Sequence, residues 1–392
     1  MCALASRPSM LTNIVDNDDI QAAISGLSAL GYELELNENT LTIHPRKTAL
    51  SAATSLNTSH SGTFSRFDAA IAALESVEVT INCSEKMATR PMKELFTALE
   101  SLGVIVKSDN QRLPATIKGP ITGITCELDA GRSSQFLSAL LIVAPLTDKG
   151  LDISLVGKQV SNSYVDMTCY WMSQMGIAIQ EKGRHLVVES GQSYQGISVN
   201  VPGDAVSASY FMGLVAIAKG QIKIESFDHN SLQGESKFYT VLEQMGMTFD
   251  KGEDYIVANS VSQLKGIEID MGEMPDVVQT LAVVAAFASG TTRITNIAHL
   301  AYKESNRIKD TATELRKAGV KVEDGDDYLV IEGSTPHAAE IETYDDHRMA
   351  MSMALLGATT KGIVIKDPQV VNKSFPNYWK LMAECGLASN EK

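Results

Sequence analysis

The amino-acid sequence predicts an α/β fold of two domains, each made of three repeated helix–strand units with a buried inner helix. The first observation behind this prediction is a helix that ends in glycine and is followed by two short strands, as in residues 315–332. The pattern occurs six times, and its glycines stand 72, 73, 70, 73 and 67 residues apart, at Gly31, Gly103, Gly176, Gly246, Gly319 and Gly386. Glycine takes the left-handed conformation at a helix end at low cost. A near-constant spacing of this kind indicates an internal repeat.

The second observation concerns an earlier helix in the units. Residues 133–146, 206–218, 276–288 and 347–358 are apolar on nearly all sides, which is typical of a helix inside a core. They are too short and too interrupted to span a membrane. The later helices, such as residues 308–319, are amphipathic and therefore lie outside. Each unit is predicted to run helix–strand–helix–strand–turn–strand.

Chain length is the third observation. A chain of 392 residues is long enough for two domains, and three units in each place the boundary near Pro202. We predict an N-terminal domain at 1–202 and a C-terminal domain at 203–392. The first unit keeps its outer helix and hairpin, whereas its inner helix is reduced to residues 2–5. The repeat predicts a strand or loop and the start of a helix ahead of Met1.

Composition limits the function classes. A net charge of −14 argues against non-specific binding to nucleic acid or to anionic membranes, although a local basic cluster can still bind an anionic small molecule. The five cysteines have no metal-ligand spacing and suit a reducing cytosol. The first residues lack the pattern of a secretory signal. We expect a cytoplasmic protein, a monomer, with no metal and no cofactor.

The inner helices of units two to six are entered through polar residues and glycine. These starts contain Gly62-Thr63, Ser133-Ser134-Gln135, Asp204, Asp276 and His347-Arg348. Serine and aspartate at one helix start usually serve as N-caps. If the inner helices of a domain run parallel, however, their N-termini converge and form a site for anions. Taken together, these N-terminal residues of the inner helices favour an anion-binding site.

Three further basic stretches allow two interpretations. Lys303-Glu304-x-x-Arg307 opens an outer helix, and its spacing alone favours a solvated helix face. Arg90 precedes Pro91 at a matching helix start and is either exposed or part of a site. Arg66 is either a ligand-binding residue or the partner of nearby Asp68.

Several motifs occur together in a characteristic order: Ser133-Ser134-Gln135, Tyr164-Val165-Asp166, Lys303-Glu304-x-x-Arg307, Asp346-His347-Arg348-Met349-Ala350 and Lys373-Ser374-Phe375-Pro376. In this set the chain closely resembles the 5-enolpyruvylshikimate-3-phosphate synthase family, the 3-phosphoshikimate 1-carboxyvinyltransferases. The resemblance implies the inside-out α/β barrel fold of enolpyruvyl transferases. It also implies transfer of the carboxyvinyl group of phosphoenolpyruvate to the 5-hydroxyl of shikimate 3-phosphate. That reaction releases phosphate and belongs to the shikimate pathway, which leads to chorismate and the aromatic amino acids.

The resemblance also implies roles for particular residues. Asp276 is the candidate base and Glu304 the proton-transfer partner. Shikimate 3-phosphate is expected to bind Ser133, Ser134, Gln135, Ser161, Tyr164, Asp276 and Lys303. Phosphoenolpyruvate is expected to bind Gly62, Thr63, Arg90, Gln135, Arg307, Arg348 and Lys373, with the arginines suited to carboxylate and phosphate.

The chain departs from the family pattern at a few positions. A family segment, Lys-Ser-x-Ser-x-Arg, would precede Met1. His60 and His299 stand where the family has asparagine, and Phe67 stands where it has proline. These departures leave an alternative open: a diverged or catalytically impaired relative that acts on, or only binds, another cyclic acid.

Overall fold

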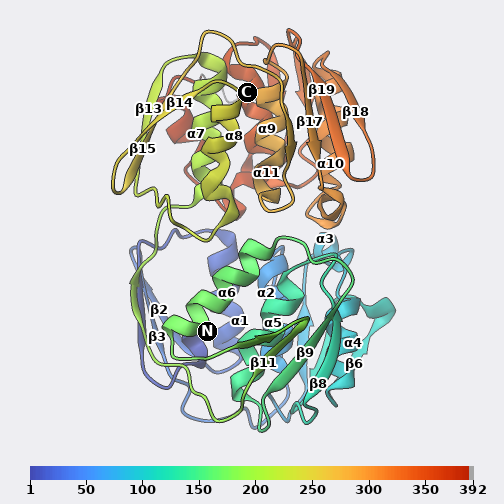
Figure 1. The fold of residues 1–392 in the computed structure, drawn as a ribbon. Helices are drawn as coiled ribbons and strands as arrows, with labels where there is room; N and C mark the ends of the chain where they lie inside the picture. Colours follow the sequence, from blue (N-terminus) through green and yellow to red (C-terminus); the bar gives the residue numbers. More distant parts are fainter. Residues whose placement is uncertain (388–392) are drawn as a thin grey trace. The chain divides into compact units, whose positions relative to one another are not determined.

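The computed structural model describes residues 1–387, which form two compact units, Met1–Val201 and a second unit that begins at Pro202. Both units combine helices with small sheets, so the α/β class predicted from the sequence is confirmed (Figure 1). We propose that the two compact units are the two domains expected from the repeat. Each is described by itself below.

The repeats begin with a short strand that the sequence pattern did not predict. This strand precedes the inner helix and pairs in parallel with the strand that follows the helix. The clearest examples are β4 (Thr54–Asn57) with β5 (Val79–Asn82), β8 (Thr125–Asp129) with β9 (Leu151–Val156), and β16 (Glu268–Asp270) with β17 (Thr291–Thr295). The predicted order is therefore wrong at its start: a repeat runs strand–helix–strand–helix–strand–strand. The leading strands were missed because they have only three to five residues each, which is too short for a reliable periodic pattern.

The N-terminal unit contains three four-stranded sheets, ordered β12-β1-β3-β2, β4-β5-β7-β6 and β10-β11-β9-β8. Its other elements are β1 (Ser9–Thr12), α1 (Asp18–Ala29), β2 (Glu33–Asn37), β3 (Thr40–His44), α2 (Gly62–Ala72), α3 (Glu85–Ala88), α4 (Lys93–Ser101), β6 (Ile105–Ser108), β7 (Ala115–Lys118), α5 (Gln135–Val143), α6 (Asn162–Gln174), β10 (Gln180–Lys182), β11 (His185–Val188) and β12 (Ser198–Asn200). The first repeat takes its leading strand from far along the chain, because β12 pairs in parallel with β1 and Met10 lies opposite Ser198. The inner helices are α2 and α5.

The C-terminal unit contains the sheets β13-β15-β14, β16-β17-β19-β18 and β20-β21. Its other elements are α7 (Ala205–Ala218), β13 (Gln221–Glu225), the 3-10 turn η4 (Gly234–Lys237), α8 (Phe238–Gln244), β14 (Thr248–Lys251), β15 (Tyr255–Asn259), η5 (Pro275–Val277), α9 (Val278–Ala285), η6 (Ala298–Tyr302), α10 (Arg307–Lys317), β18 (Lys321–Asp324), β19 (Tyr328–Glu332), β20 (Ala339–Ile341), α11 (His347–Ala354), β21 (Ile363–Ile365), η8 (Pro368–Lys373) and α12 (Tyr378–Glu384). The inner helices α7, α9 and α11 lie side by side (Figure 1).

The six marker glycines adopt the conformation for which they were selected from the sequence. Their φ angles are 82°, 88°, 88°, 107°, 81° and 95° at Gly31, Gly103, Gly176, Gly246, Gly319 and Gly386. Each follows a helix and turns the chain out of it, in the left-handed region that side chains disfavour. The prediction of a repeated helix–glycine–strand element is therefore confirmed.

The inner helices are buried, as predicted, and they approach one another closely. Ser209 on α7, Thr280 on α9 and Ser352 on α11 are buried at equivalent positions of three repeats. The Thr280 Oγ1 atom lies 3.4 Å from Ser209 Oγ and 3.2 Å from Ser352 Oγ, so hydroxyl groups link the three helices at their centre. Gly213 also permits the approach, because a Cβ atom there would lie 2.9 Å from Leu355 Cδ1.

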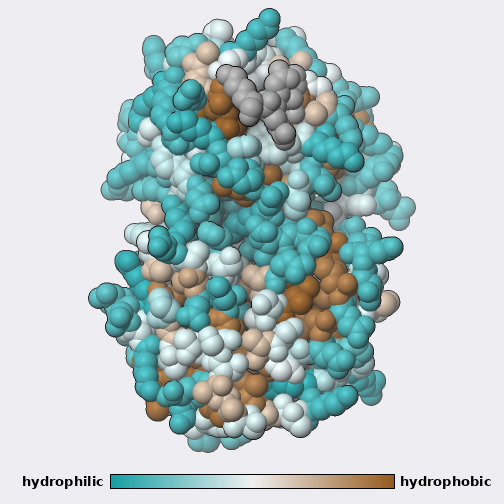
Figure 2. Space-filling view, turned by 180° about the vertical axis from the view of Figure 1, so that it is seen from behind, coloured by the Kyte–Doolittle hydropathy of each residue, from teal (hydrophilic) through white to brown (hydrophobic). Residues whose placement is uncertain are grey.

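The surface of the protein is largely polar, in contrast to its apolar inner helices. Hydrophilic residues cover much of the face seen in Figure 2, and hydrophobic residues show between them. Within residues 1–387, no helix combines the length and the apolar character that a membrane crossing requires. The apolar helices of the sequence are thus accounted for by the two cores.

Asp68 of α2 is a buried carboxyl group with an unusual environment. It is fully buried, and neither of its oxygens has a hydrogen-bond partner among the described residues. The pairing with Arg66 considered from the sequence is wrong, because residues two apart face different sides of a helix. Burial raises the pKa of Asp68 from 3.8 to about 8, so this carboxyl keeps its proton at neutral pH.

We therefore expect the Asp68 carboxyl to make stability depend on pH. Below pH 4 it is protonated in the folded and the unfolded chain. As pH rises towards 8, only the unfolded chain releases the proton, so the free energy of unfolding falls. Relative to Asp68→Asn, the wild type should lose about 2 to 3 kcal/mol between pH 6 and pH 9 in urea denaturation. Asp109→Asn, at an exposed position, is the control and should follow the wild type. Parallel pH curves for wild type and Asp68→Asn would contradict this expectation.

Candidate active site

The first group of candidate residues lies in the N-terminal unit, at the starts of α2 and α5. Gln135 donates from Nε2 to Thr63 Oγ1 over 2.9 Å, and its Oε1 accepts from Arg66 Nη1 over 2.6 Å. Arg66 also donates to the carbonyl oxygens of Gly62 and Pro91, over 3.1 Å and 3.3 Å. The structure thus joins the first turns of two inner helices through side chains that the sequence had placed in separate motifs.

Arg90 belongs to this group because it lies against the start of α2. A Cβ atom at Gly62 would lie 2.2 Å from Arg90 Nη1, so only glycine at that position lets the guanidinium approach the helix backbone. Arg90 is 7% exposed, and the alternative of a merely exposed arginine is wrong. The guanidinium and the free N–H groups of the helix start both favour an anion here.

The predicted serines and Tyr164 lie at the starts of α5 and α6. Ser134 is the N-cap residue of α5 but makes no capping hydrogen bond with its side chain, whereas Ser133 Oγ accepts from the Gln135 N–H over 3.3 Å. Ser161 precedes α6 in a left-handed conformation with φ of 53°, and its carbonyl accepts the Tyr164 N–H over 3.1 Å. A left-handed serine is uncommon and often marks a functional position.

The second group lies in the C-terminal unit and is organised around Arg307. Its guanidinium bonds to three carboxylates: Nη1 to Asp276 Oδ1 over 2.9 Å, Nη2 to Glu304 Oε2 over 2.8 Å, and Nε to Asp346 Oδ2 over 2.8 Å. Arg307 is 1% exposed. The interpretation of Lys303–Arg307 as a solvated helix face is therefore wrong. The sequence could not distinguish the two cases, because Asp276 and Asp346 lie 31 and 39 residues away along the chain and only the fold brings them to Arg307.

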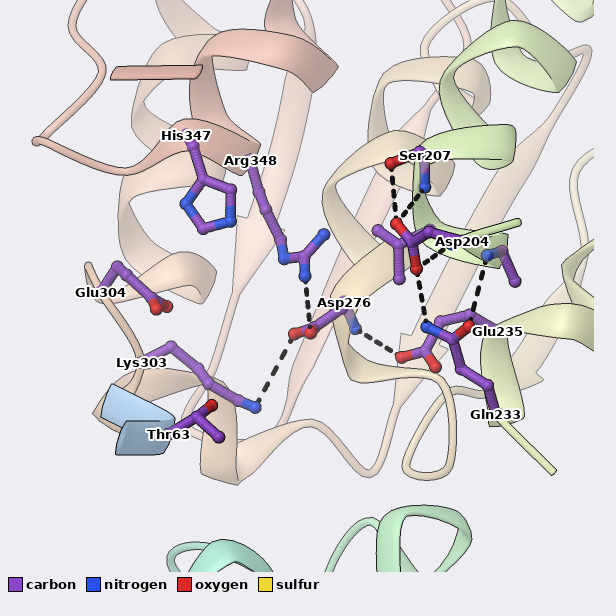
Figure 3. A network of polar contacts seen from close by, with 12 residues as sticks. Thr63, Asp204, Ser207, Gln233, Glu235, Asp276, Lys303, Glu304, His347 and Arg348 are labelled. Atoms are coloured by element: carbon purple, nitrogen blue, oxygen red, sulfur yellow. Dashed lines mark hydrogen bonds and ion pairs between the residues drawn. The ribbon is translucent and has the colours of Figure 1, made fainter. Parts of the chain in front are cut away.

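Asp276 lies between three cations. Its Oδ2 accepts from Arg348 Nη2 over 2.9 Å, and its Oδ1 lies 3.7 Å from Lys303 Nζ (Figure 3). Burial alone would raise the pKa of Asp276, but the neighbouring cations, Arg348 first among them, outweigh burial and hold this pKa well below its usual range. The carboxylate is therefore ionised and a poor base in this arrangement.

Glu304 is held by a different pair of cations. Its Oε1 accepts from Lys373 Nζ over 3.1 Å, and its Oε2 accepts from Arg307. His347 lies beside this pair, 3% exposed, with Nδ1 3.6 Å from Asp346 Oδ1. Burial and the charges of Lys373 and Arg348 lower the pKa of His347 well below its usual value, so the imidazole is neutral.

The ion pairs show that helix starts converge within the C-terminal unit. Asp276 lies in η5, which leads directly into α9, Arg307 begins α10 and Arg348 stands in the first turn of α11. Four cationic side chains (Lys303, Arg307, Arg348 and Lys373) meet three carboxylates (Asp276, Glu304 and Asp346). With a neutral His347 the group has an excess of positive charge, and the helix N-termini add to it. Such a group can bind anions and also offers carboxylates for proton transfer.

Several residues of these groups were not selected from the sequence as site residues. Arg66, Asp346, Ser305, His347 and Glu235 are all buried, and each bonds or lies next to a predicted residue. The signal for Asp346 and His347 was present, because both belong to the motif around Arg348. Glu235 had none, since it lies in an irregular polar stretch. His299, one of the departures from the family pattern, is buried in η6, whereas His60 is exposed.

The repeated α/β fold thus brings cations and carboxylates together at helix starts, an arrangement that suits an anion-binding site with groups for proton transfer. Among residues 1–387, no group of three histidine, cysteine, aspartate or glutamate side chains is arranged to hold a metal ion.

Comparison with known proteins identifies the family. The family model for EPSP synthase (3-phosphoshikimate 1-carboxyvinyltransferase) matches residues 1–382. A 3-phosphoshikimate 1-carboxyvinyltransferase of Shewanella baltica is 40% identical over 98% of this chain and 92% of that protein, and one of Vibrio vulnificus is 37% identical with the same coverage. An EPSP synthase structure from Acinetobacter baumannii superimposes with a TM-score of 0.81 at 24% identity, over 99% of this chain and 92% of that one.

The chain belongs to the EPSP synthase family, a family of transferases. The resemblance inferred from the ordered motifs is thereby confirmed, and so is the predicted fold.

Proposed function

We propose that this chain transfers the carboxyvinyl group of phosphoenolpyruvate to the 5-hydroxyl of shikimate 3-phosphate and releases inorganic phosphate. Its family supports this function, and the observation that carries it is the group of four cations and three carboxylates around Arg307. Phosphoenolpyruvate bears a carboxylate and a phosphate, and arginine forks suit both. No observation on the described residues favours the alternative of a relative that only binds a cyclic acid.

The reaction requires proton transfer at two atoms. The 5-oxygen of shikimate 3-phosphate loses its proton as it bonds to C2 of phosphoenolpyruvate, while the methylene carbon C3 gains a proton. The C2–O bond to phosphate then breaks, and C3 returns a proton as the double bond forms again. One group must accept the hydroxyl proton and another must serve C3.

We assign the hydroxyl proton to Asp276, with its basicity controlled by the substrates. In the structure described here, Arg348, Lys303 and Arg307 keep the pKa of Asp276 low. When a substrate phosphate or carboxylate binds to these cations, it takes a share of their charge. Asp276 then loses part of its stabilisation as an anion and its pKa rises. In this proposal the base becomes effective only once anionic substrate is bound.

Glu304 is the candidate for the proton at C3. It is held between Lys373 and Arg307, whereas Asp276 is held by Arg348, Lys303 and Arg307. Two carboxylates with different sets of cations can take different roles in one reaction.

Arg348→Ala should weaken phosphoenolpyruvate binding much more than binding of shikimate 3-phosphate. Arg348 is 15% exposed in its side chain, lies at the start of α11 and carries a charge-assisted hydrogen bond to Asp276. Loss of such a bond to a ligand anion costs about 1.5 to 3 kcal/mol, or roughly 10- to 150-fold in Kd. Calorimetry with each ligand measures the two effects. Arg293→Ala, at an exposed ion pair, is the control and should change neither. Equal losses for both ligands would refute this division of roles.

The function itself is tested by phosphate release. The chain is incubated with both substrates, and then with each substrate omitted. We expect release only when both are present. Release from phosphoenolpyruvate alone would indicate hydrolysis, and no release despite binding of both ligands would support the alternative of a binding protein.

We further propose that the chain works as a monomer in the cytoplasm. All five cysteines lie among the described residues and are free thiols, which suits a reducing compartment. Size-exclusion chromatography with light scattering tests the oligomeric state, and a dimer at micromolar concentration would contradict this part of the proposal.

A further inference from the structure

Glu235 lies next to Asp276 but has no role in the mechanism described so far. It stands in the 3-10 turn η4 and is 1% exposed. Its Oε1 atom accepts the backbone N–H of Asp276 over 3.2 Å (Figure 3). Glu235 therefore fixes the backbone position from which the candidate base extends.

The second oxygen of Glu235 is the unusual feature. Oε2 is buried and has no hydrogen-bond partner among residues 1–387. Buried polar atoms are nearly always hydrogen-bonded, and a buried carboxylate without compensation is unfavourable. A protonated carboxyl avoids that penalty, because it carries no charge into the interior.

The charged groups around Glu235 also favour the protonated form. Asp276 on η5 is an ionised neighbour, and Asp204 at the start of α7 is connected to the same turn through Gln233, whose Nε2 donates to it over 3.0 Å. Lys237, at the end of η4, donates instead to the His229 carbonyl. Burial, and then the charge of Asp276, raise the pKa of Glu235 to about 7, while Arg348 acts in the opposite direction. The one charged residue of α8, Glu243, is exposed.

We propose that Glu235 is a positioning residue for Asp276 that works as a neutral acid: one oxygen holds the Asp276 N–H, and the retained proton keeps a further negative charge out of the anion site. This inference rests on the proposed function for the identity of the anion. The C-terminal group must attract phosphoenolpyruvate with its excess of positive charge. An ionised Glu235 cancels part of that excess.

The inference gives a specific dependence on pH. Below about pH 7 Glu235 is protonated, and the site has its full affinity for anions. As pH rises through this range Glu235 loses its proton, so affinity falls by up to about tenfold per pH unit. Glutamine keeps an oxygen that can accept the Asp276 N–H and never ionises.

The test is calorimetric titration of phosphoenolpyruvate, in the presence of shikimate 3-phosphate, between pH 6 and pH 9. Titration of the ligand itself affects wild type and Glu235→Gln equally. Across this range the affinity of the wild type for phosphoenolpyruvate should therefore fall at least about tenfold more than that of Glu235→Gln. Glu235→Asp remains titratable and should keep the loss. Glu243→Gln makes the same chemical change at an exposed position, and it should follow the wild type. Identical pH profiles for wild type and Glu235→Gln would overturn the proposal.

A second measurement covers the case in which Glu235→Gln does not fold. Burial also raises the pKa of Asp68, so the measurement uses the Asp68→Asn background. Infrared difference spectra of this variant should show a protonated carboxyl at pH 6 that is lost by pH 8.5. If no protonated carboxyl is detected at pH 6, the proposal is equally overturned. Both measurements are independent of turnover. A chain that binds phosphoenolpyruvate with the expected pH profile but releases no phosphate would contradict the proposed function and leave the role of Glu235 intact.

Discussion

Asp276→Asn is expected to abolish turnover while the site keeps its affinity for anions. The substitution removes the group that accepts the hydroxyl proton, and loss of a positioned base typically costs 10²- to 10⁴-fold in rate. It also removes the negative charge that Arg348 and Arg307 contact over 2.9 Å each. Each guanidinium then has one charged partner fewer and can bind a ligand anion more strongly. We expect kcat to fall by about 10³-fold or more and the Kd of phosphoenolpyruvate to stay equal or decrease.

The comparison of kcat with Kd makes this prediction specific. A damaged fold would weaken binding and turnover together, whereas loss of the base affects turnover alone. Asp254→Asn, at an exposed position in the same unit, provides the matched control and should leave both unchanged. Turnover within threefold of wild type in Asp276→Asn would remove Asp276 from the role of base.

Arg307→Met is expected to have the largest effect on stability. Arg307 is 1% exposed, and it is the main partner of Asp346, which is fully buried. Without the guanidinium, a carboxylate remains in the core with Ser305 and the Arg348 N–H as its remaining hydrogen-bond donors in the described chain. Removal of one partner from a buried ion pair destabilises a protein by about 3 to 5 kcal/mol. Chemical denaturation should show a loss of this size in the C-terminal unit.

An arginine on the same helix provides the control. Arg316 on α10 pairs with Asp324, but its side chain is 45% exposed. Exposed ion pairs contribute at most about 1 kcal/mol, so Arg316→Met should destabilise far less. Similar losses for the two variants would mean that burial of Arg307 does not determine its contribution. A second substitution, Asp346→Asn in the Arg307→Met background, should recover part of the loss, because it removes the unpaired charge.

Much of the fold could be predicted from local patterns. A glycine at the end of each outer helix and apolar residues around each inner helix are properties of neighbouring residues, and they are visible in the sequence. The leading strands were not predictable in this way. They have three to five residues and are held by parallel pairing with distant strands, in the extreme case β12 with β1, 188 residues apart at Met10 and Ser198.

The candidate site likewise has a part that the sequence predicts and a part that it does not. Motif residues such as Arg348 and Gln135 could be selected because the repeat puts them at helix starts. Which residues pair with one another could not be predicted from the sequence. The spacing of Lys303, Glu304 and Arg307 along the chain favours a solvated helix face. Only the fold shows that Asp276 and Asp346 contact Arg307. Glu235 reaches Asp276 from a turn without regular structure, and its burial has no signature in the sequence.

The most direct test of the central claim is to identify the product. The chain is incubated with shikimate 3-phosphate and phosphoenolpyruvate labelled with ¹³C at C3, and the mixture is followed by ¹³C and ³¹P NMR. We predict a labelled vinyl methylene on an ether at the 5-oxygen, formed together with an equal amount of inorganic phosphate. Labelled pyruvate in place of the ether, or a spectrum that does not change while both ligands are bound, would contradict this prediction.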